Sequence, residues 1–187
     1  MIPTKFNANL FIYSMRSALS NKKIKDFIVS TRNDYVFLVD DNLVYLTMMQ
    51  EEIKKFLPNS RILSFTSGES CLEKIDLHPF LILLDFDLSG ESKNSINGMK
   101  TLREIKHKSP NTEVVMLSGV DNLKIVVNSM KFGAFDYVVK GEHAMNNLRS
   151  KIGHVVRKLR IRDGRAEKNQ FNWLFKWITI LVLLVVI

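Results

Sequence analysis

Apolar residues follow two different patterns between residues 35 and 160. Five short runs are almost wholly apolar, as in strands buried on both faces; they cover residues 35–39, 61–65, 81–84, 113–117 and 135–139. After each run, apolar residues recur at helical spacing, over residues 43–56, 71–75, 98–108, 123–132 and 142–160. The capping-box spacing from Thr66 to Glu69 predicts that the second of these helices is capped at Thr66. Strands that alternate with helices in this way predict an α/β domain, with a doubly wound five-stranded parallel sheet and helices on both faces.

The two ends of the chain have other patterns. Residues 1–34 mix apolar and polar positions and predict an extension that is partly helical, with a docking or interfacial helix left open. Residues 171–187 contain one charge, Lys176, and begin with Trp173 and Trp177. Seventeen helical residues span about 26 Å, near the short limit for a bilayer core of roughly 30 Å, so a membrane anchor is expected rather than a buried terminal helix.

Charge divides the chain at similar places. The net charge is +4 over residues 1–34, −2 over residues 35–140 and +6 over residues 141–187. The basic residues lead into the apolar tail, which favours a membrane surface over nucleic acid. Residues 157–170, which include the predicted basic linker 161–170, could instead bind nucleic acid, but they lack the interleaved aromatic residues of a single-strand binder. The positive-inside tendency predicts that residues 35–160 lie on the cytoplasmic side of the membrane, with a purely cytoplasmic protein as the alternative.

Single polar residues stand at the ends of four predicted strands. Asp40 and Asp41 follow the first strand, Asp85 the third, Ser118 the fourth and Lys140 the fifth. Alone, each has an ordinary interpretation as a helix cap or a solvated side chain. In a parallel sheet these ends share one edge, where α/β folds bind ligands. Carboxylates within ~4 Å of each other repel by about 4 kcal/mol, so the group requires a cation, and its oxygen ligands suit Mg²⁺.

These motifs resemble the receiver domains of two-component response regulators. The resemblance covers residues 35–160 and depends on Val-Asp-Asp-Asn around Asp40, Leu-Leu-Asp-Phe-Asp around Asp85, Met-Leu-Ser-Gly around Ser118 and Tyr-Val-Val-Lys before Lys140. It implies a flavodoxin-like sheet with strand order 2-1-3-4-5.

The resemblance also implies a role for each residue. Asp85 is the expected phosphoacceptor, and Lys140 neutralises the acyl phosphate. Metal ligands are expected from Asp40, Asp41, Asp85 and the backbone carbonyl of Asp87. Ser118 is expected to bond a phosphoryl oxygen and to act as a switch with Tyr137.

The sequence departs from the family pattern near the acceptor. Twelve residues separate Asp85 from Gly98, which is longer than the family's usual spacing, so residues 90–97 are interpreted as a surface insertion. Gly141 follows Lys140 where the family often has Pro, so a cis peptide is not expected there. Asp87 adds an acid near the acceptor and is expected to change the lifetime of the phosphoryl group.

The sequence thus predicts a single-domain response regulator, not an enzyme apart from slow self-dephosphorylation. Its expected partners are a histidine kinase or phosphotransfer protein, a downstream protein and the membrane; a homodimer is left open. Two alternatives are a non-phosphorylated receiver-like scaffold at the membrane and a phosphate-drain intermediate of a phosphorelay. Cys71 is the only cysteine, so no disulfide forms within the chain. The four histidines lack the spacing of metal ligands.

Overall fold

The computed structural model describes residues 34–88 and 97–162. Two compact units are distinguished, residues 1–34 and residues 35–187, and apart from Asp34 every described residue belongs to the second. The predicted extension, the 90–97 insertion apart from Asn97, and most of the predicted linker and tail lie outside the described residues. Within the described residues, no helix has the length and the apolar character needed to cross a membrane.

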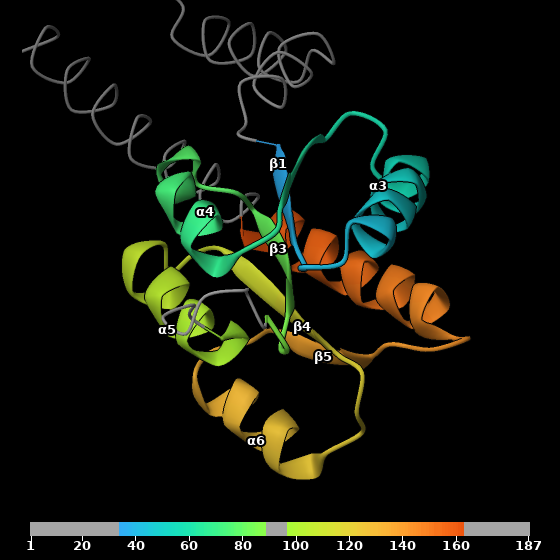
Figure 1. Cartoon of the computed structure of the whole chain (residues 1–187). Helices are drawn as coiled ribbons and strands as arrows, with labels where there is room; N and C mark the ends of the chain where they lie inside the picture. Colours follow the sequence, from blue (N-terminus) through green and yellow to red (C-terminus); the bar gives the residue numbers. More distant parts are fainter. Residues whose placement is uncertain (1–33, 89–96, 163–187) are drawn as a thin grey trace, which may run out of the picture. The chain divides into compact units, whose positions relative to one another are not determined.

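The described residues form one parallel sheet of five strands in the order β2-β1-β3-β4-β5 (Figure 1). The strands are β1 (Tyr35–Val39), β2 (Arg61–Phe65), β3 (Leu81–Asp85), β4 (Glu113–Ser118) and β5 (Asp136–Val139). Every residue of β3 and β4 is buried, as expected of inner strands covered on both faces. The predicted parallel sheet and its strand order are confirmed.

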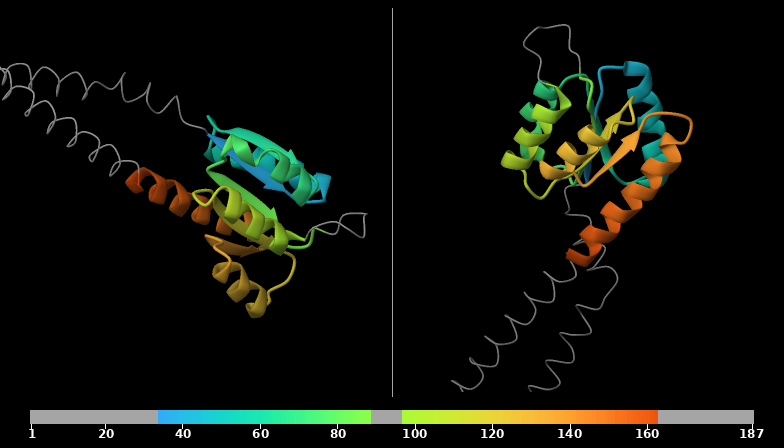
Figure 2. Two further views of the ribbon diagram at one scale, coloured as in Figure 1. Left: turned by 90° about the vertical axis from the view of Figure 1, so that its left-hand side faces the viewer. Right: turned by 90° about the horizontal axis from the view of Figure 1, so that it is seen from below.

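Helices cover both faces of this sheet (Figure 2). The helices are α3 (Leu43–Phe56), α4 (Gly68–Glu73), the 3₁₀ turn η1 (Ile75–Leu77), α5 (Gly98–Lys108), α6 (Leu123–Lys131) and a helix described over residues 144–162. One apolar cluster joins the sheet to α3 and the 144–162 helix, and the other joins it to α4, η1 and α5. The predicted doubly wound architecture is therefore confirmed.

Two predicted helix boundaries are wrong by one or two residues. The second helix is capped by Ser67 rather than Thr66, because the hydroxyl oxygen of Ser67 accepts a hydrogen bond from the backbone N–H of Ser70 at 3.2 Å. The 144–162 helix begins two residues later than Glu142. In the described residues no peptide bond is cis, as expected from Gly141.

Candidate functional site

Strand register brings the polar strand ends together at one edge of the sheet. Val39 pairs with Leu84, so the residues that follow them, Asp40 and Asp85, stand side by side. Ser118 pairs with Val139, the residue before Lys140, and the backbone N–H of Lys140 continues this ladder by donating to the Ser118 carbonyl at 2.7 Å. The convergence expected from the parallel topology is present.

Three carboxylates form the acidic part of this site. Each of Asp40, Asp41 and Asp85 offers one oxygen, and these oxygens all lie within 4.8 Å of one another. Asp40 and Asp85 are buried, whereas Asp41 is exposed. Burial, assisted by the charge of Asp40, raises the pKa of Asp85 above its usual range, although Lys140 and the backbone N–H of Asp87 act in the opposite direction. The carboxylates therefore need positive charge nearby.

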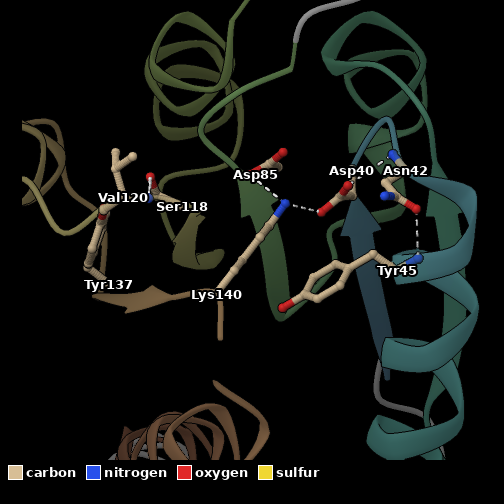
Figure 3. A network of polar contacts seen from close by, with 8 residues as sticks. All are labelled: Asp40, Asn42, Tyr45, Asp85, Ser118, Val120, Tyr137 and Lys140. Atoms are coloured by element: carbon tan, nitrogen blue, oxygen red, sulfur yellow. Dashed lines mark hydrogen bonds and ion pairs between the residues drawn. The ribbon is translucent and has the colours of Figure 1, made fainter. Parts of the chain in front are cut away.

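Lys140 supplies that charge (Figure 3). Its Nζ donates a hydrogen bond to Asp40 Oδ2 at 2.6 Å and forms an ion pair with Asp85 Oδ1 at 2.9 Å. Burial alone lowers the pKa of Lys140, but its contacts with Asp40 and Asp85 outweigh burial, and the pKa lies above the ordinary lysine value. Lys140 is therefore a permanent cation between the two buried acids.

Two residues that the sequence analysis did not single out complete the acidic side. The backbone N–H of Asn42 donates to Asp40 Oδ1 at 3.0 Å, and the Asn42 side chain accepts from the backbone N–H of Tyr45 at 3.0 Å, capping α3. The ring of Tyr45 faces Lys140, with its centroid 4.7 Å from Nζ. The cap has a sequence signal, an Asn directly before the first apolar position of a predicted helix, but no sequence rule directs the tyrosine ring to the lysine.

Ser118 and Tyr137 meet at the backbone of Val120 (Figure 3). The hydroxyl oxygen of Ser118 accepts a hydrogen bond from the Val120 N–H at 3.2 Å, and the Tyr137 hydroxyl donates to the Val120 carbonyl at 2.6 Å. Ser118 is fully buried, whereas the side chain of Val120 is half exposed. Ser118 and Tyr137, which are predicted to act together, therefore both bind the backbone of Val120.

Gly98 is a third residue whose importance sequence reasoning missed. Its N–H donates to the Phe86 carbonyl at 3.1 Å. A Cβ atom at this position would lie 2.0 Å from the backbone oxygen of Asp85, far inside any allowed contact, so only glycine fits against the end of β3. The side chain of Asp87, by contrast, is exposed at the edge of the site.

The donor set fits magnesium. Carboxylate oxygens from one exposed and two buried residues, open to water on one side, match the few protein ligands that Mg²⁺ takes. Within the described residues the cluster contains no histidine or cysteine, as expected for a hard cation. The expected metal ligands Asp40, Asp41 and Asp85 thus lie together, and the role of the Asp87 carbonyl stays a prediction.

A family model decides the identity of this domain. Residues 36–153 match the model described as "Response regulator receiver domain". The chain belongs to the response regulator receiver family. Receiver domains are phosphoacceptors that bind Mg²⁺ at an acidic pocket, here represented by Asp40, Asp41 and Asp85, and that interact with histidine kinases or phosphotransfer proteins.

Curated relatives contain similar receiver domains. The chain is 27% identical over 106 residues to the transcriptional regulatory protein ZraR of Klebsiella oxytoca, covering 56% of this chain and 22% of that protein. It is 25% identical over 104 residues to the chemotaxis protein CheY of Thermotoga maritima, covering 55% of this chain and 82% of that protein. The chain thus spans about a fifth of ZraR and most of CheY.

Solved structures with the same fold are also receiver domains. A CheY-like receiver domain protein from Methanospirillum hungatei matches with a TM-score of 0.58 at 19% identity, over 67% of this chain and 96% of that chain. A receiver domain protein from Clostridium thermocellum matches with a TM-score of 0.58 at 22% identity, over 68% of this chain and 97% of that chain. At this identity the similarity concerns the fold.

Proposed function

We propose that the chain is a two-component response regulator in which Asp85 accepts a phosphoryl group from a histidine kinase or phosphotransfer protein. The observation that supports this most directly is the contact of Lys140 Nζ with Asp85, 2.9 Å away, at the carboxyl end of β3. Phosphoryl transfer to a carboxylate needs positioning and charge neutralisation more than covalent assistance from the protein. The site offers both.

The residues around Asp85 divide this work. Burial fixes the Asp85 carboxylate at the strand end, and the ion pair with Lys140 orients it. The ammonium group of Lys140 can move from the Asp85 carboxylate to an oxygen of the phosphoryl group, because the four-carbon stem of lysine is flexible. Asp40, Asp41 and Asp85, with the Asp87 carbonyl, would hold Mg²⁺, which when bound neutralises charge on the transferred group.

The output of phosphorylation is proposed to pass through Ser118 and Tyr137. A phosphoryl oxygen on Asp85 attracts the Ser118 hydroxyl, which then leaves its bond with the Val120 N–H. Because the Tyr137 hydroxyl holds the carbonyl of the same residue, the loop and the tyrosine move together. Apolar side chains on this loop and on α6 are exposed, namely Val120, Leu123 and Val127, and their rearrangement gives a downstream protein a different surface to bind.

Mass analysis after incubation with acetyl phosphate and Mg²⁺ tests the acceptor. We expect the wild type to gain one phosphoryl group and Asp85→Asn to gain none. Asp76→Asn, which alters an exposed acid in η1, is the matched control and should be labelled like the wild type. Equal labelling of wild type and Asp85→Asn would reject Asp85 as the acceptor. Absence of label on both would favour the scaffold alternative, and rapid loss of label after transfer would favour the phosphate drain.

A second proposal concerns location at the cytoplasmic side of the membrane. It is supported by composition alone: the apolar residues 171–187 and the basic residues from Arg157 to Lys168. We expect the full chain to co-float with anionic liposomes, with the basic residues adding a salt-sensitive component to this binding. Binding to DNA with the same salt sensitivity, without binding to liposomes, would contradict this proposal.

A further inference from the structure

The ring of Tyr45 contacts the charged residue of the site. Its ring centroid lies 4.7 Å from Lys140 Nζ, within the range of a favourable cation–π interaction. The ring is fixed at the start of α3 because the Tyr45 N–H is bound by the capping residue Asn42. It also packs against the apolar cluster beneath α3. Among the residues that the structure describes, the ammonium group of Lys140 therefore contacts Asp40, Asp85 and an anchored aromatic ring.

The position of Lys140 in the sheet explains why such an anchor is useful. Lys140 follows β5, at the edge of the sheet, while Asp85 ends β3 and Asp40 follows β1, so the lysine side chain must cross the end of β4. Adjacent strands are about 4.8 Å apart, and a lysine stem that reaches this far loses much of its rotamer freedom. Both carboxylates that hold the ammonium also belong to the candidate metal site, and an oxygen that ligates a metal is less available to the lysine.

We propose that Tyr45 is a positioning residue, whose ring keeps the ammonium group of Lys140 beside Asp85 independently of the two carboxylates. This inference rests on the phosphoacceptor role proposed above for Asp85. The ring is a suitable anchor because it attracts the cation without offering an oxygen that competes for metal or phosphoryl group.

The tyrosine hydroxyl has no part in this role. Its oxygen is buried, and among the described residues it has no hydrogen-bond partner. Burial accordingly raises the pKa of Tyr45 above the ordinary value, so the side chain stays neutral beside the acids. The aromatic face alone makes the contact, and Tyr45→Phe and Tyr45→Leu therefore separate the ring from the hydroxyl.

Two measurements on the full-length protein test this inference. The first is the NMR shift of the Lys140 ε-methylene group without metal, which the ring should move upfield in wild type and Tyr45→Phe but not in Tyr45→Leu. The second is the rate of labelling by acetyl phosphate with Mg²⁺. We expect Tyr45→Leu to be slower by about tenfold and Tyr45→Phe to retain the wild-type rate.

Two further variants show whether the effect passes through Lys140. Tyr35 also has a cation over its ring, Arg61 at 5.5 Å, but lies at the opposite end of β1, so Tyr35→Leu is the matched control and should keep the wild-type rate. In a Lys140→Met background, Tyr45→Leu should cause no further loss. Circular dichroism and thermal unfolding establish that each variant is folded.

The results of these measurements either support or overturn the positioning role of Tyr45. A wild-type rate and an unchanged Lys140 shift in Tyr45→Leu would overturn the inference and leave the phosphoacceptor proposal intact. Equal slowing by Tyr45→Phe and Tyr45→Leu, or an undiminished effect in Lys140→Met, would also overturn it, because the ring would then not act through the lysine. If neither wild type nor Asp85→Asn is labelled, the phosphoacceptor proposal fails and the inference fails with it.

Discussion

Replacing Gly98 with Ala should damage both the stability of the domain and the acceptor itself. The added Cβ would lie 2.0 Å from the Asp85 carbonyl oxygen and 2.8 Å from the Phe86 Cα. Ordinary contact between such atoms requires a little over 3 Å, so the backbone at Asp85 or at the start of α5 must move by about 1 Å. Overpacking costs about 1–3 kcal/mol, and the upper end applies because neither neighbour is a flexible side chain.

Urea denaturation and thermal unfolding measure this effect. We expect Gly98→Ala to lose about 3 kcal/mol, which corresponds to roughly 10 °C in Tm for a domain of this size. The variant should also be labelled by acetyl phosphate about 100-fold more slowly, since a displacement of 1 Å has this effect at a reacting group.

Gly153→Ala is the matched control for this prediction. Gly153 lies in the 144–162 helix, where an added Cβ meets nothing within 4 Å, so Ala should stabilise the domain by about 0.5–1 kcal/mol. A Gly98→Ala variant as stable as the wild type and labelled at the same rate would refute the reasoning, because the close approach of α5 to the acceptor strand would then not exist in solution.

Three further predictions concern charge at the site. Without metal, Asp85→Asn should raise the Tm near neutral pH, and the gain should shrink as pH falls through the raised pKa of Asp85, because the folded wild type then binds a proton and no longer buries a charge; a gain independent of pH would contradict this. Lys140→Met leaves Asp40 and Asp85 without their cation and should lose about 3 kcal/mol in urea denaturation in EDTA, whereas a loss below about 1 kcal/mol would mean that the pair is solvated. Mg²⁺ at about 100 times its dissociation constant should stabilise the wild type by about 2.7 kcal/mol, and calorimetry should find little of this in Asp41→Asn; equal stabilisation of both would place the metal elsewhere.

The fold was predictable because its strongest sequence signals are patterns over many residues rather than single side chains. Wholly apolar runs such as Leu81–Leu84, alternating with helical patterns, favour inner strands, and the parallel topology then brings every strand end to one edge. The positions of Asp40, Asp85, Ser118 and Lys140 follow from that topology without knowledge of any side-chain conformation.

The contacts that sequence reasoning missed depend on the conformation of one side chain or one backbone segment. Tyr45 reads as one more partly apolar position of α3, and only the direction of its ring makes it a neighbour of Lys140. Gly98 reads as the beginning of a helix, because no local pattern reveals that a backbone packs against it. The Ser67 cap was displaced by one residue, since Thr66 and Ser67 are equivalent by propensity and differ only in which one begins the turn.

The backbone of Lys140 links the site to the edge of the domain. Its N–H extends the pairing of β5 with β4, while its side chain reaches Asp85 and Asp40. Because β5 is a terminal strand of the sheet, a change that breaks its pairing with β4 would move the ammonium group of Lys140 away from Asp40 and Asp85. If Asp85 is the phosphoacceptor proposed above, a ligand or substitution at the β5 edge would change its reactivity while leaving all three aspartates intact.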